Sequence, residues 1–216
     1  MPDTKDDLQT VAAEVRVCQL CSLAAGRIQS VPGEGPPNAE LMLIGEGPGQ
    51  NEDKQGRPFV GASGQFLTTL IAAAGYKRED VFIANVVKCR PPQNRDPLPE
   101  EISACAQYLD RQIALINPKV IVTLGRFSMA RYFPGAKISA IHGQAKVIDG
   151  RTVVPMFHPA AALHQAALRP ILEADFARLK QIIASAQADA GPVAPASEPA
   201  KPEDGDASGG EQLSLF

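Results

Sequence analysis

The sequence contains no long apolar segment and only four cysteines, and both features limit the classes of protein to which it can belong. No stretch approaches the roughly 20 apolar residues that a membrane-spanning helix requires. The N-terminal segment MPDTKDDLQT is acidic and has no apolar core, so we do not expect a secretory signal. We therefore expect a cytoplasmic protein with no membrane association, in which the four cysteines do not form lasting disulfides.

Length and charge suggest one folded domain followed by a tail. The chain has 216 residues, of which 44% are hydrophobic, which is enough for one medium domain with a substantial core. From Gln187 onward, six acidic residues and one lysine give a charge of −5, whereas the whole chain carries −3. The preceding part therefore carries about +2, which is compatible with a polyanionic partner. We expect a folded domain over residues 1–186, a disordered linker over 187–211 and an apolar terminus over 212–216.

Short apolar runs alternate with segments of helical periodicity. The apolar runs predict four strands, over residues 40–44, 81–87, 120–124 and 152–157. The helical spacing predicts helices over residues 6–17, 64–74, 99–116, 127–132 and 170–186. This alternation favours an α/β fold, a three-layer α/β/α sandwich around a central, mostly parallel four-stranded sheet. The Asp149-Gly150 turn after Val147-Ile148 suggests a hairpin into the last strand.

Polar residues follow three of the predicted strands. Glu46 comes after the first strand, Asn85 ends the second, and His158 comes directly after the last. In an open α/β sheet, ligands bind beyond the carboxyl ends of the strands. We therefore expect these three side chains to converge. The long glycine- and carboxylate-rich loop over residues 45–61 follows the first strand and is more typical of a site than of a connector.

The side chains in these segments suit a flat ring. The Asn85 amide can recognise the N3–H and O4 edge of uracil, whereas cytosine presents the opposite pattern. Phe59 offers a face for stacking, and His158 can donate to a ring oxygen that gains negative charge. Backbone N–H groups of the turn over residues 47–49 can cradle the same ring. Together these groups predict a pocket for a pyrimidine taken out of the base stack.

Each of these features has a simpler interpretation. The GEGPG turn could bind nucleotide phosphates, but it lacks both GxGxxG and a GK[ST] ending. Asn85 could be a satisfied core amide, His158 a plain strand exit and Phe59 a packing residue of the loop.

The four cysteines comprise a CxxC, Cys18 and Cys21, and the isolated Cys89 and Cys105. Zinc ribbons usually present two CxxC pairs, and four thiols suit buried packing, zinc or an iron–sulfur cluster.

Three blocks in order, GEGPGQNEDKQGRPFVGASG, NVVKCRPPQNRDP and HPAAALH, resemble the signature segments of family 4 uracil-DNA glycosylases. The likeness covers roughly residues 15–185. It implies the fold of the uracil-DNA glycosylase superfamily and a monofunctional hydrolase that excises uracil from DNA without cutting the backbone. It also implies a [4Fe–4S] cluster with four ligands, Cys18, Cys21, Cys89 and Cys105.

The resemblance also implies roles for individual residues. The catalytic residues would be Glu46, Glu52 and His158, with His158 stabilising the departing uracil anion at O2. The substrate-binding residues would be Gly47, Asp53, Phe59 and Asn85. Either Glu52 or Asp53 would shape the pocket or orient water. The alternatives are a non-catalytic iron–sulfur DNA-binding relative and a glycosylase for a different deaminated base.

The loop over residues 88–97 is basic. Its bases Lys88, Arg90 and Arg95 could be an ordinary solvated face, but we expect phosphate contacts near the pocket. One branch of related glycosylases captures the sugar covalently with a histidine in an inserted basic loop. The loop here is short and has no histidine, so we do not expect covalent capture. Leu163, after His158, is the candidate to fill the gap left in the duplex.

The chain ends in an apolar pentapeptide on a polar tether. QLSLF resembles the peptide by which bacterial DNA polymerases and repair proteins bind the sliding clamp. Its residues are Gln212, Leu213, Ser214, Leu215 and Phe216. The simpler alternative is an incidental apolar terminus. We expect a monomer whose partners are uracil-containing DNA, single- or double-stranded, and the clamp.

Overall fold

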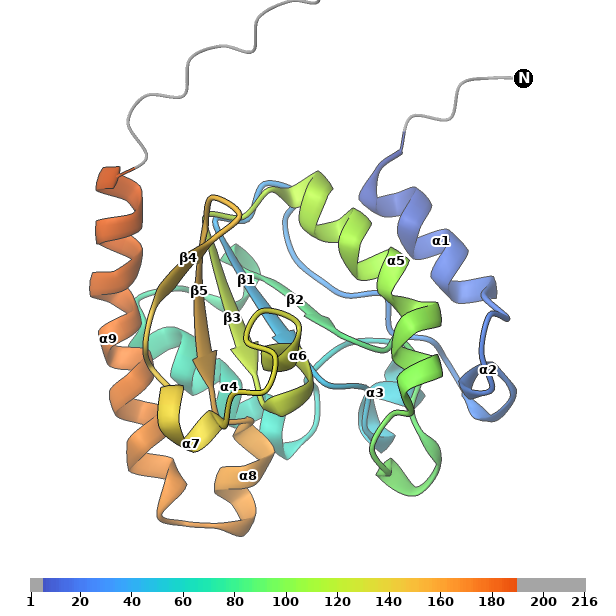
Figure 1. Cartoon of the computed structure of the whole chain (residues 1–216). Helices are drawn as coiled ribbons and strands as arrows, with labels where there is room; N and C mark the ends of the chain where they lie inside the picture. Colours follow the sequence, from blue (N-terminus) through green and yellow to red (C-terminus); the bar gives the residue numbers. More distant parts are fainter. Residues whose placement is uncertain (1–5, 190–216) are drawn as a thin grey trace, which may run out of the picture.

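The structure is a computed structural model and describes residues 6–189. Its core is a five-stranded sheet with the order β2-β1-β3-β5-β4 (Figure 1). The strands are β1 (Leu41–Gly45), β2 (Phe82–Asn85), β3 (Val120–Leu124), β4 (Lys146–Ile148) and β5 (Arg151–Met156). The first three and β5 are parallel, as predicted, and β4 pairs antiparallel with β5. The hairpin is therefore confirmed, and its outer arm adds one strand to the predicted four.

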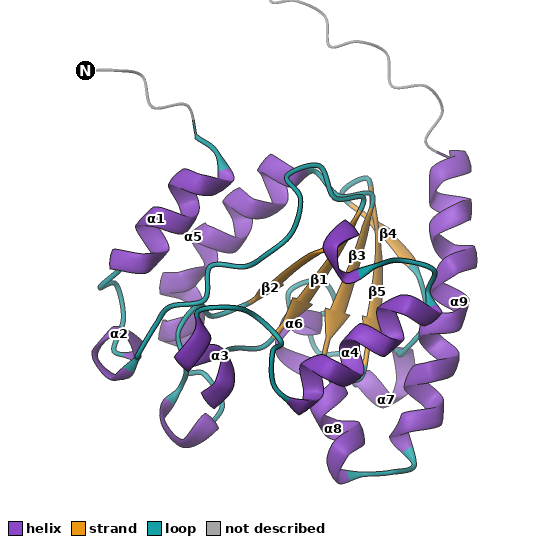
Figure 2. Cartoon of the chain, turned by 180° about the vertical axis from the view of Figure 1, so that it is seen from behind, coloured by secondary structure: helices purple, strands orange, loops and turns teal. Residues whose placement is uncertain are grey.

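Helices cover both faces of the sheet, which confirms the three-layer α/β/α arrangement (Figures 1 and 2). One face packs against α1 (Leu8–Val17) and α5 (Pro99–Ile116). The other packs against α4 (Ala62–Ala73), α8 (Pro159–His164) and α9 (Leu168–Asp189). Four short helices lie in the connections: α2 (Leu23–Gly26), α3 (Gln50–Gln55), α6 (Arg126–Ala130) and α7 (Ile138–Ile141).

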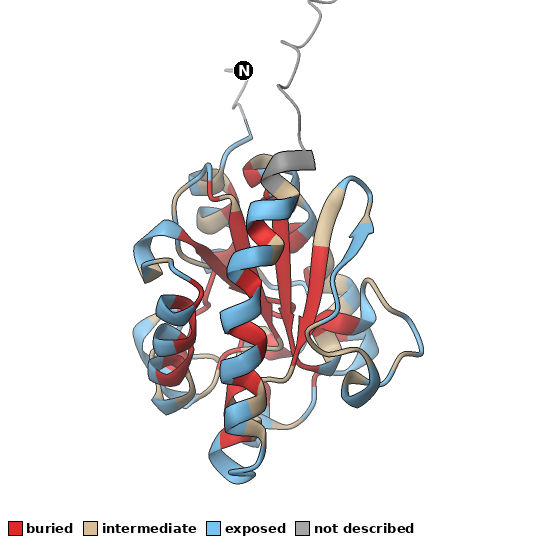
Figure 3. Ribbon diagram, turned by 90° about the vertical axis from the view of Figure 1, so that its left-hand side faces the viewer, coloured by how far each residue is buried: buried red, intermediate tan, exposed pale blue. Residues whose placement is uncertain are grey.

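The central strands are buried on both faces because helices cover that part of the sheet, whereas the edge strand β4 is largely exposed. In β1, Leu41 and Leu43 join the cluster beneath α4 and α9, whereas Met42 and Ile44 join the cluster beneath α1 and α5. Strands of this kind are near-continuous apolar runs rather than alternating ones, which is why they could be found in the sequence. Figure 3 shows α9 with its buried side against the sheet and its exposed side outward.

Several boundaries differ from the prediction. The strand predicted over residues 81–87 spans only Phe82–Asn85, and most other elements differ by one or two residues at an end. The helix predicted over residues 170–186 spans Leu168–Asp189, so the first three residues of the predicted linker are helical. The rest of that linker and the clamp-like pentapeptide over residues 212–216 lie outside the described residues. The segment predicted as one long loop contains α3, which begins after Gly49. Within residues 6–189, no helix combines the length and the apolar character needed to cross a membrane.

The sheet topology fixes where a ligand can bind. After β1 the chain passes to β2 on one side of β1, and later to β3 on the other side. Strand order therefore reverses next to β1, and the crevice beyond the carboxyl ends at such a point is the usual ligand site. Residues 6 and 189 lie at the opposite end of the sheet, so neither end of the described chain covers this crevice (Figure 1).

Candidate active site

A pocket of about 320 Å³ lies beyond the carboxyl ends of β1, β2 and β5. This volume is at the lower end of the range for ligand sites, roughly 300–1,000 Å³. Its lining includes six of the predicted catalytic and substrate-binding residues: Glu46, Gly47, Glu52, Phe59, Asn85 and His158. The predicted convergence of three strand ends is therefore confirmed. Ser63 and Asn94 also line the pocket and had no distinguishing signal in the sequence.

Asn85 is held at the back of the pocket by the register of the sheet. It pairs with Gly45 in the β1–β2 ladder and is only 1% exposed. A Cβ atom on Gly45 would lie 2.4 Å from Asn85 Oδ1 and 2.6 Å from Phe59 Cζ, so glycine leaves the space that both side chains occupy. Asn85 Oδ1 receives no hydrogen bond from the described protein groups. An unpaired buried acceptor costs about 1–3 kcal/mol, so this oxygen is a candidate to accept a hydrogen bond from a ligand in the pocket.

Phe59 and His158 form a wall of aromatic rings. Their centroids are 5.6 Å apart and their planes are inclined by 29°. Phe59 has a φ of 50°, a left-handed conformation that is unusual for a bulky residue. Glu52 holds the segment that follows Phe59, because its Oε1 accepts hydrogen bonds from the N–H groups of Val60 and Gly61, both at 2.9 Å. Its other oxygen accepts from Gly49 N–H at 3.1 Å. Of the two predicted roles for Glu52, this geometry supports shaping the pocket.

His158 is presented as a neutral hydrogen-bond donor. It caps α8, and its Nδ1 accepts from Ala160 N–H at 3.1 Å, so the ring proton of the neutral form sits on Nε2. Burial lowers the pKa of His158 to about 4, although the nearby Glu52 carboxylate favours protonation. The imidazole is therefore uncharged at neutral pH and has one N–H available for a ligand.

Glu46 provides a carboxylate of raised basicity. Burial raises its pKa, the charge of Asp96 raises it further, and Arg126 opposes the shift. A carboxylate with a raised pKa accepts a proton more readily than an exposed one, which suits a group that activates water.

Two predicted contacts are wrong. Lys88 was expected to meet phosphate, but it is 1% exposed, and its Nζ donates to Asn85 O at 3.0 Å and Gln112 Oε1 at 2.6 Å. Burial lowers its pKa to about 8. Asp53 was expected to bind substrate, but it is 2% exposed, does not line the pocket and accepts from Ile28 N–H at 2.9 Å. Both residues hold loops together rather than touch a ligand, and sequence spacing alone does not reveal that.

The remaining predicted DNA contacts lie where DNA could reach them. Arg95 lines the pocket, and its side chain is 37% exposed. Arg90 is partly exposed and donates to Asn94 Oδ1 at 2.7 Å. Leu163 lies on α8, five residues after His158, and is 47% exposed.

All four cysteines line one small, apolar cavity between α1, α2 and α5. Three of their sulfur atoms accept N–H hydrogen bonds: Cys18 from Leu20 N at 3.5 Å, Cys105 from Lys88 N at 3.3 Å and Cys89 from Arg27 Nη1 at 3.3 Å. Such bonds stabilise thiolate over thiol and occur around iron–sulfur clusters. Among residues 6–189, no three histidine, cysteine or carboxylate side chains form a group that could hold a single metal ion.

The three-layer fold and this pocket define an α/β protein whose candidate site lies beyond the carboxyl ends of its parallel strands. Residues 32–182 match the Uracil DNA glycosylase superfamily, and the chain belongs to this family.

Relatives named as type-4 uracil-DNA glycosylases match most of the chain. The protein from Sulfurisphaera tokodaii is 49% identical, over 82% of this chain and 85% of its own length. The one from Saccharolobus solfataricus is 48% identical, over 83% of this chain and 88% of its own length. The one from Thermotoga maritima is 44% identical, over 83% of this chain and 97% of its own length.

Acid stability should depend on Glu101, which joins the pocket to the cysteine region. Its buried carboxylate binds Arg95, Leu98 N–H and Ser22, and the bond from Arg95 chiefly lowers its pKa to about 2. Because the folded pKa lies below the unfolded value of about 4.3, the stabilisation is complete above that value and disappears as the pH falls towards 2. Arg95 is partly exposed, so we expect a contribution on the order of 2 kcal/mol.

The measurement is urea unfolding of the wild type and Glu101→Gln at pH 7, 5 and 3. The difference in unfolding free energy should persist from pH 7 to 5 and shrink at pH 3. Glu100→Gln, at an exposed neighbouring position, is the matched control. An unchanged difference at pH 3 would contradict the assignment.

Proposed function

We propose that the protein is a monofunctional uracil-DNA glycosylase of the type-4 kind, which extrudes uracil from DNA and hydrolyses its N-glycosidic bond to leave an abasic site. The observation that carries this proposal is the buried, unpaired Oδ1 of Asn85, beside Phe59 and a neutral His158. Uracil carries an N3–H that can donate to Asn85 Oδ1 and an O4 that can accept from its amide. Cytosine has no proton on N3, so it would leave Oδ1 unpaired.

The pocket supports a dissociative reaction. As the N1–C1′ bond loosens, negative charge builds on the uracil ring and positive charge on the sugar. His158 Nε2–H donates to the ring oxygen O2, and a preorganised donor of this kind is most effective where charge develops. Glu46, with its raised pKa, orients the water that attacks the sugar. Phe59 stacks on the extruded ring. Each group acts in a water-poor site, where its electrostatic effect is larger than in solvent.

The first test is incubation with a uracil-containing oligonucleotide, followed by alkali to break the strand at abasic sites. We expect cleavage at uracil, and no cleavage of the same strand with thymine or cytosine. No strand break with uracil would favour the non-catalytic DNA-binding alternative. Preferential release of hypoxanthine or xanthine from competing oligonucleotides would favour the other specificity.

Asn85→Asp should lose most activity on uracil. The change replaces the donor to O4 by a carboxylate and places a charge in a buried site, so we expect kcat/KM to fall about 10²–10³-fold, since one lost hydrogen bond to a charged transition state is worth that much. Selectivity for uracil over cytosine should fall as well. Unchanged activity and selectivity would remove Asn85 from the base-recognition role.

The pH dependence should show no titration of His158 near neutrality. With a pKa of about 4, the imidazole stays neutral from pH 5 to 8, so protonation of His158 should not alter kcat in that range. The measurement is single-turnover rate against pH for the wild type and His158→Gln. A limb with a midpoint near 6.5 that disappears in the variant would show that His158 is a conventional titrating base.

We infer that the four cysteines hold a [4Fe–4S] cluster. All four sulfurs line one apolar cavity and three accept N–H bonds, which suits thiolates bound to iron. Four thiolates on one zinc ion, each at about 2.3 Å, would lie within roughly 4 Å of one another. Four thiolates also suit a cluster, in which each binds its own iron, and the similarity to type-4 uracil-DNA glycosylases favours the cluster over zinc. The cluster is a structural part that joins α1 and α5 to the loop over residues 88–97.

Iron analysis should find a cluster that depends on all four thiols. Anaerobically purified protein should contain about four iron and four sulfide per chain, with thiolate-to-iron absorption in the visible range. Cys105→Ala should lose iron and unfold at lower temperature. A protein that contains zinc and no sulfide would contradict the cluster.

We also propose that Arg90 and Arg95 contact DNA phosphates and that Leu163 fills the gap left by the extruded base. Arg95 lines the pocket, and Arg90 donates to Asn94, which also lines it. Leu163 is an exposed apolar side chain on the helix that His158 caps. Phosphate contacts position the duplex without reading its sequence. Exposed apolar side chains are used as wedges in other DNA-bending proteins.

The pentapeptide over residues 212–216 is proposed to bind a bacterial sliding clamp, on its sequence alone. A chain that ends at residue 211 should lose co-elution with purified clamp while keeping full activity on short oligonucleotides. Equal co-elution of both chains would contradict the proposal.

A further inference from the structure

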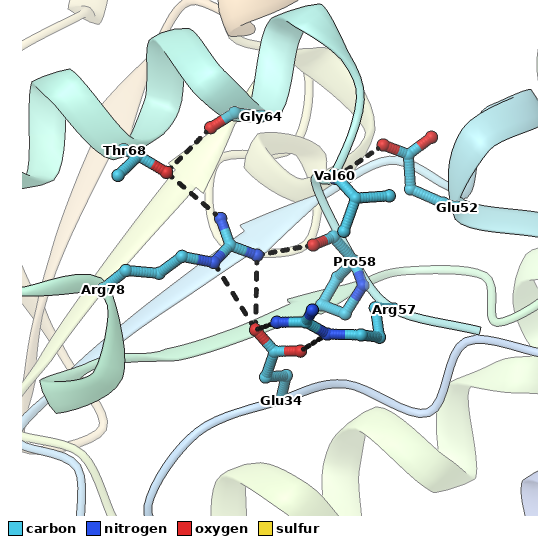
Figure 4. Close-up of polar contacts among 8 residues, drawn as sticks. All are labelled: Glu34, Glu52, Arg57, Pro58, Val60, Gly64, Thr68 and Arg78. Atoms are coloured by element: carbon cyan, nitrogen blue, oxygen red, sulfur yellow. Dashed lines mark hydrogen bonds and ion pairs between the residues drawn. The ribbon is translucent and has the colours of Figure 1, made fainter. Parts of the chain in front are cut away.

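A charged network holds residues 57–60, the segment that carries Phe59, and its members Glu34, Arg57 and Arg78 are not part of the pocket lining. Glu34 accepts from Arg57 Nε at 2.6 Å and lies 3.4 Å from Arg78, which donates to Pro58 O at 2.6 Å (Figure 4). The Arg78 side chain is only 19% exposed. A charge-assisted bond in this setting is less screened than a surface ion pair.

Arg78 connects three parts of the fold. It begins the short 3-10 helix η1 (Arg78–Asp80) before β2, reaches Glu34 in the loop before β1, and approaches Thr68 Oγ1 of α4 at 3.5 Å. Its bond to Pro58 therefore anchors the Phe59 segment to the strand that ends in Asn85. The stacking ring and the base-reading amide are thereby fixed relative to each other.

Phe59 needs such support because its backbone is strained. At a φ of 50° it would relax towards ordinary backbone if its neighbours allowed it. Glu52 fixes the residues that follow Phe59, and Arg78 fixes the carbonyl of Pro58, which precedes Phe59 (Figure 4). Gly64 permits the close approach of α4, since a Cβ there would lie 1.9 Å from Phe59 O.

We propose that Arg78, oriented by Glu34, is a positioning residue that keeps Phe59 in the conformation that receives the extruded base. This inference rests on the proposed function. Without Arg78, only a fraction of molecules hold Phe59 in place before DNA arrives. The apparent affinity for substrate then falls by that fraction, while the chemical step in the bound state is unchanged.

The test is single-turnover kinetics of the full chain on a single-stranded uracil-containing oligonucleotide. Arg78→Ala should raise the half-saturating enzyme concentration about tenfold, with the maximal rate within about twofold of wild type. Arg78→Lys keeps the charge and one donor, so its value should be intermediate. Arg131→Ala is the matched control, because Arg131 also forms an ion pair and also lies outside the pocket lining, but its ion pair is with Asp110 of α5 rather than with the segment that carries Phe59.

A double-mutant cycle separates positioning from general stabilisation. If Arg78 acts through Phe59, adding Arg78→Ala to Phe59→Ala should raise the half-saturating concentration no further. The proposal would be overturned if the two substitutions had additive effects on the half-saturating concentration. It would also be overturned if Arg78→Ala had the same half-saturating concentration as Arg131→Ala. If Arg78→Ala does not fold, Arg78→Lys enters the cycle in its place.

Amide hydrogen exchange keeps this test separate from the proposed function. Arg78→Ala should speed exchange at Val60 and Gly61 relative to Arg131→Ala, whether or not uracil is the substrate. If the wild type is inactive on uracil but Arg78→Ala still speeds exchange, the proposed glycosylase activity is rejected, while the positioning of Phe59 by Arg78 is supported. Active wild type with unchanged exchange would reject the positioning role alone.

Discussion

The pairing of Gly45 with Asn85 is the constraint on which the site depends. Parallel β1 and β2 place these residues side by side, and the missing side chain of Gly45 leaves one space for the Asn85 amide and the Phe59 ring. The sheet thus sets the position of the Asn85 amide by backbone hydrogen bonds, which a loop could not do as rigidly. Phe59 and His158 are then brought to the same place by a clamped segment and a capped helix.

Buried charge ties the pocket to the cysteine cavity. Lys88 lines that cavity, and its ammonium group bonds to the backbone of Asn85 and to Gln112. Glu101 joins Ser22, next to Cys21, to Arg95 at the pocket. Buried ions are costly unless every hydrogen bond is satisfied, so these contacts fix the relative position of the two regions. Any group bound by the four cysteines would therefore stiffen the loop that borders the pocket.

Much of the fold and the centre of the site could be predicted because both follow from pattern. Apolar runs marked the parallel strands, and strand ends located Glu46, Asn85 and His158. Side-chain direction could not be predicted. Lys88 follows the same strand as Asn85 but turns inward, and Asp53 lies next to Glu52 but faces a different loop. Arg78 and Glu34 carry no motif, since their contact is between segments far apart in the sequence.

The unsatisfied acceptor of Asn85 has a consequence for the resting molecule. No described protein group donates to that atom, and a small imide that enters the pocket could do so. Such a ligand would raise the free energy of unfolding by an amount set by its concentration relative to its Kd. For a chain of this size, each kcal/mol corresponds to a melting temperature about 2–4 °C higher. Thermal-shift screening of ring fragments, with and without an N–H between two carbonyls, would therefore rank compounds by how well they complete the pocket, with no nucleic acid present.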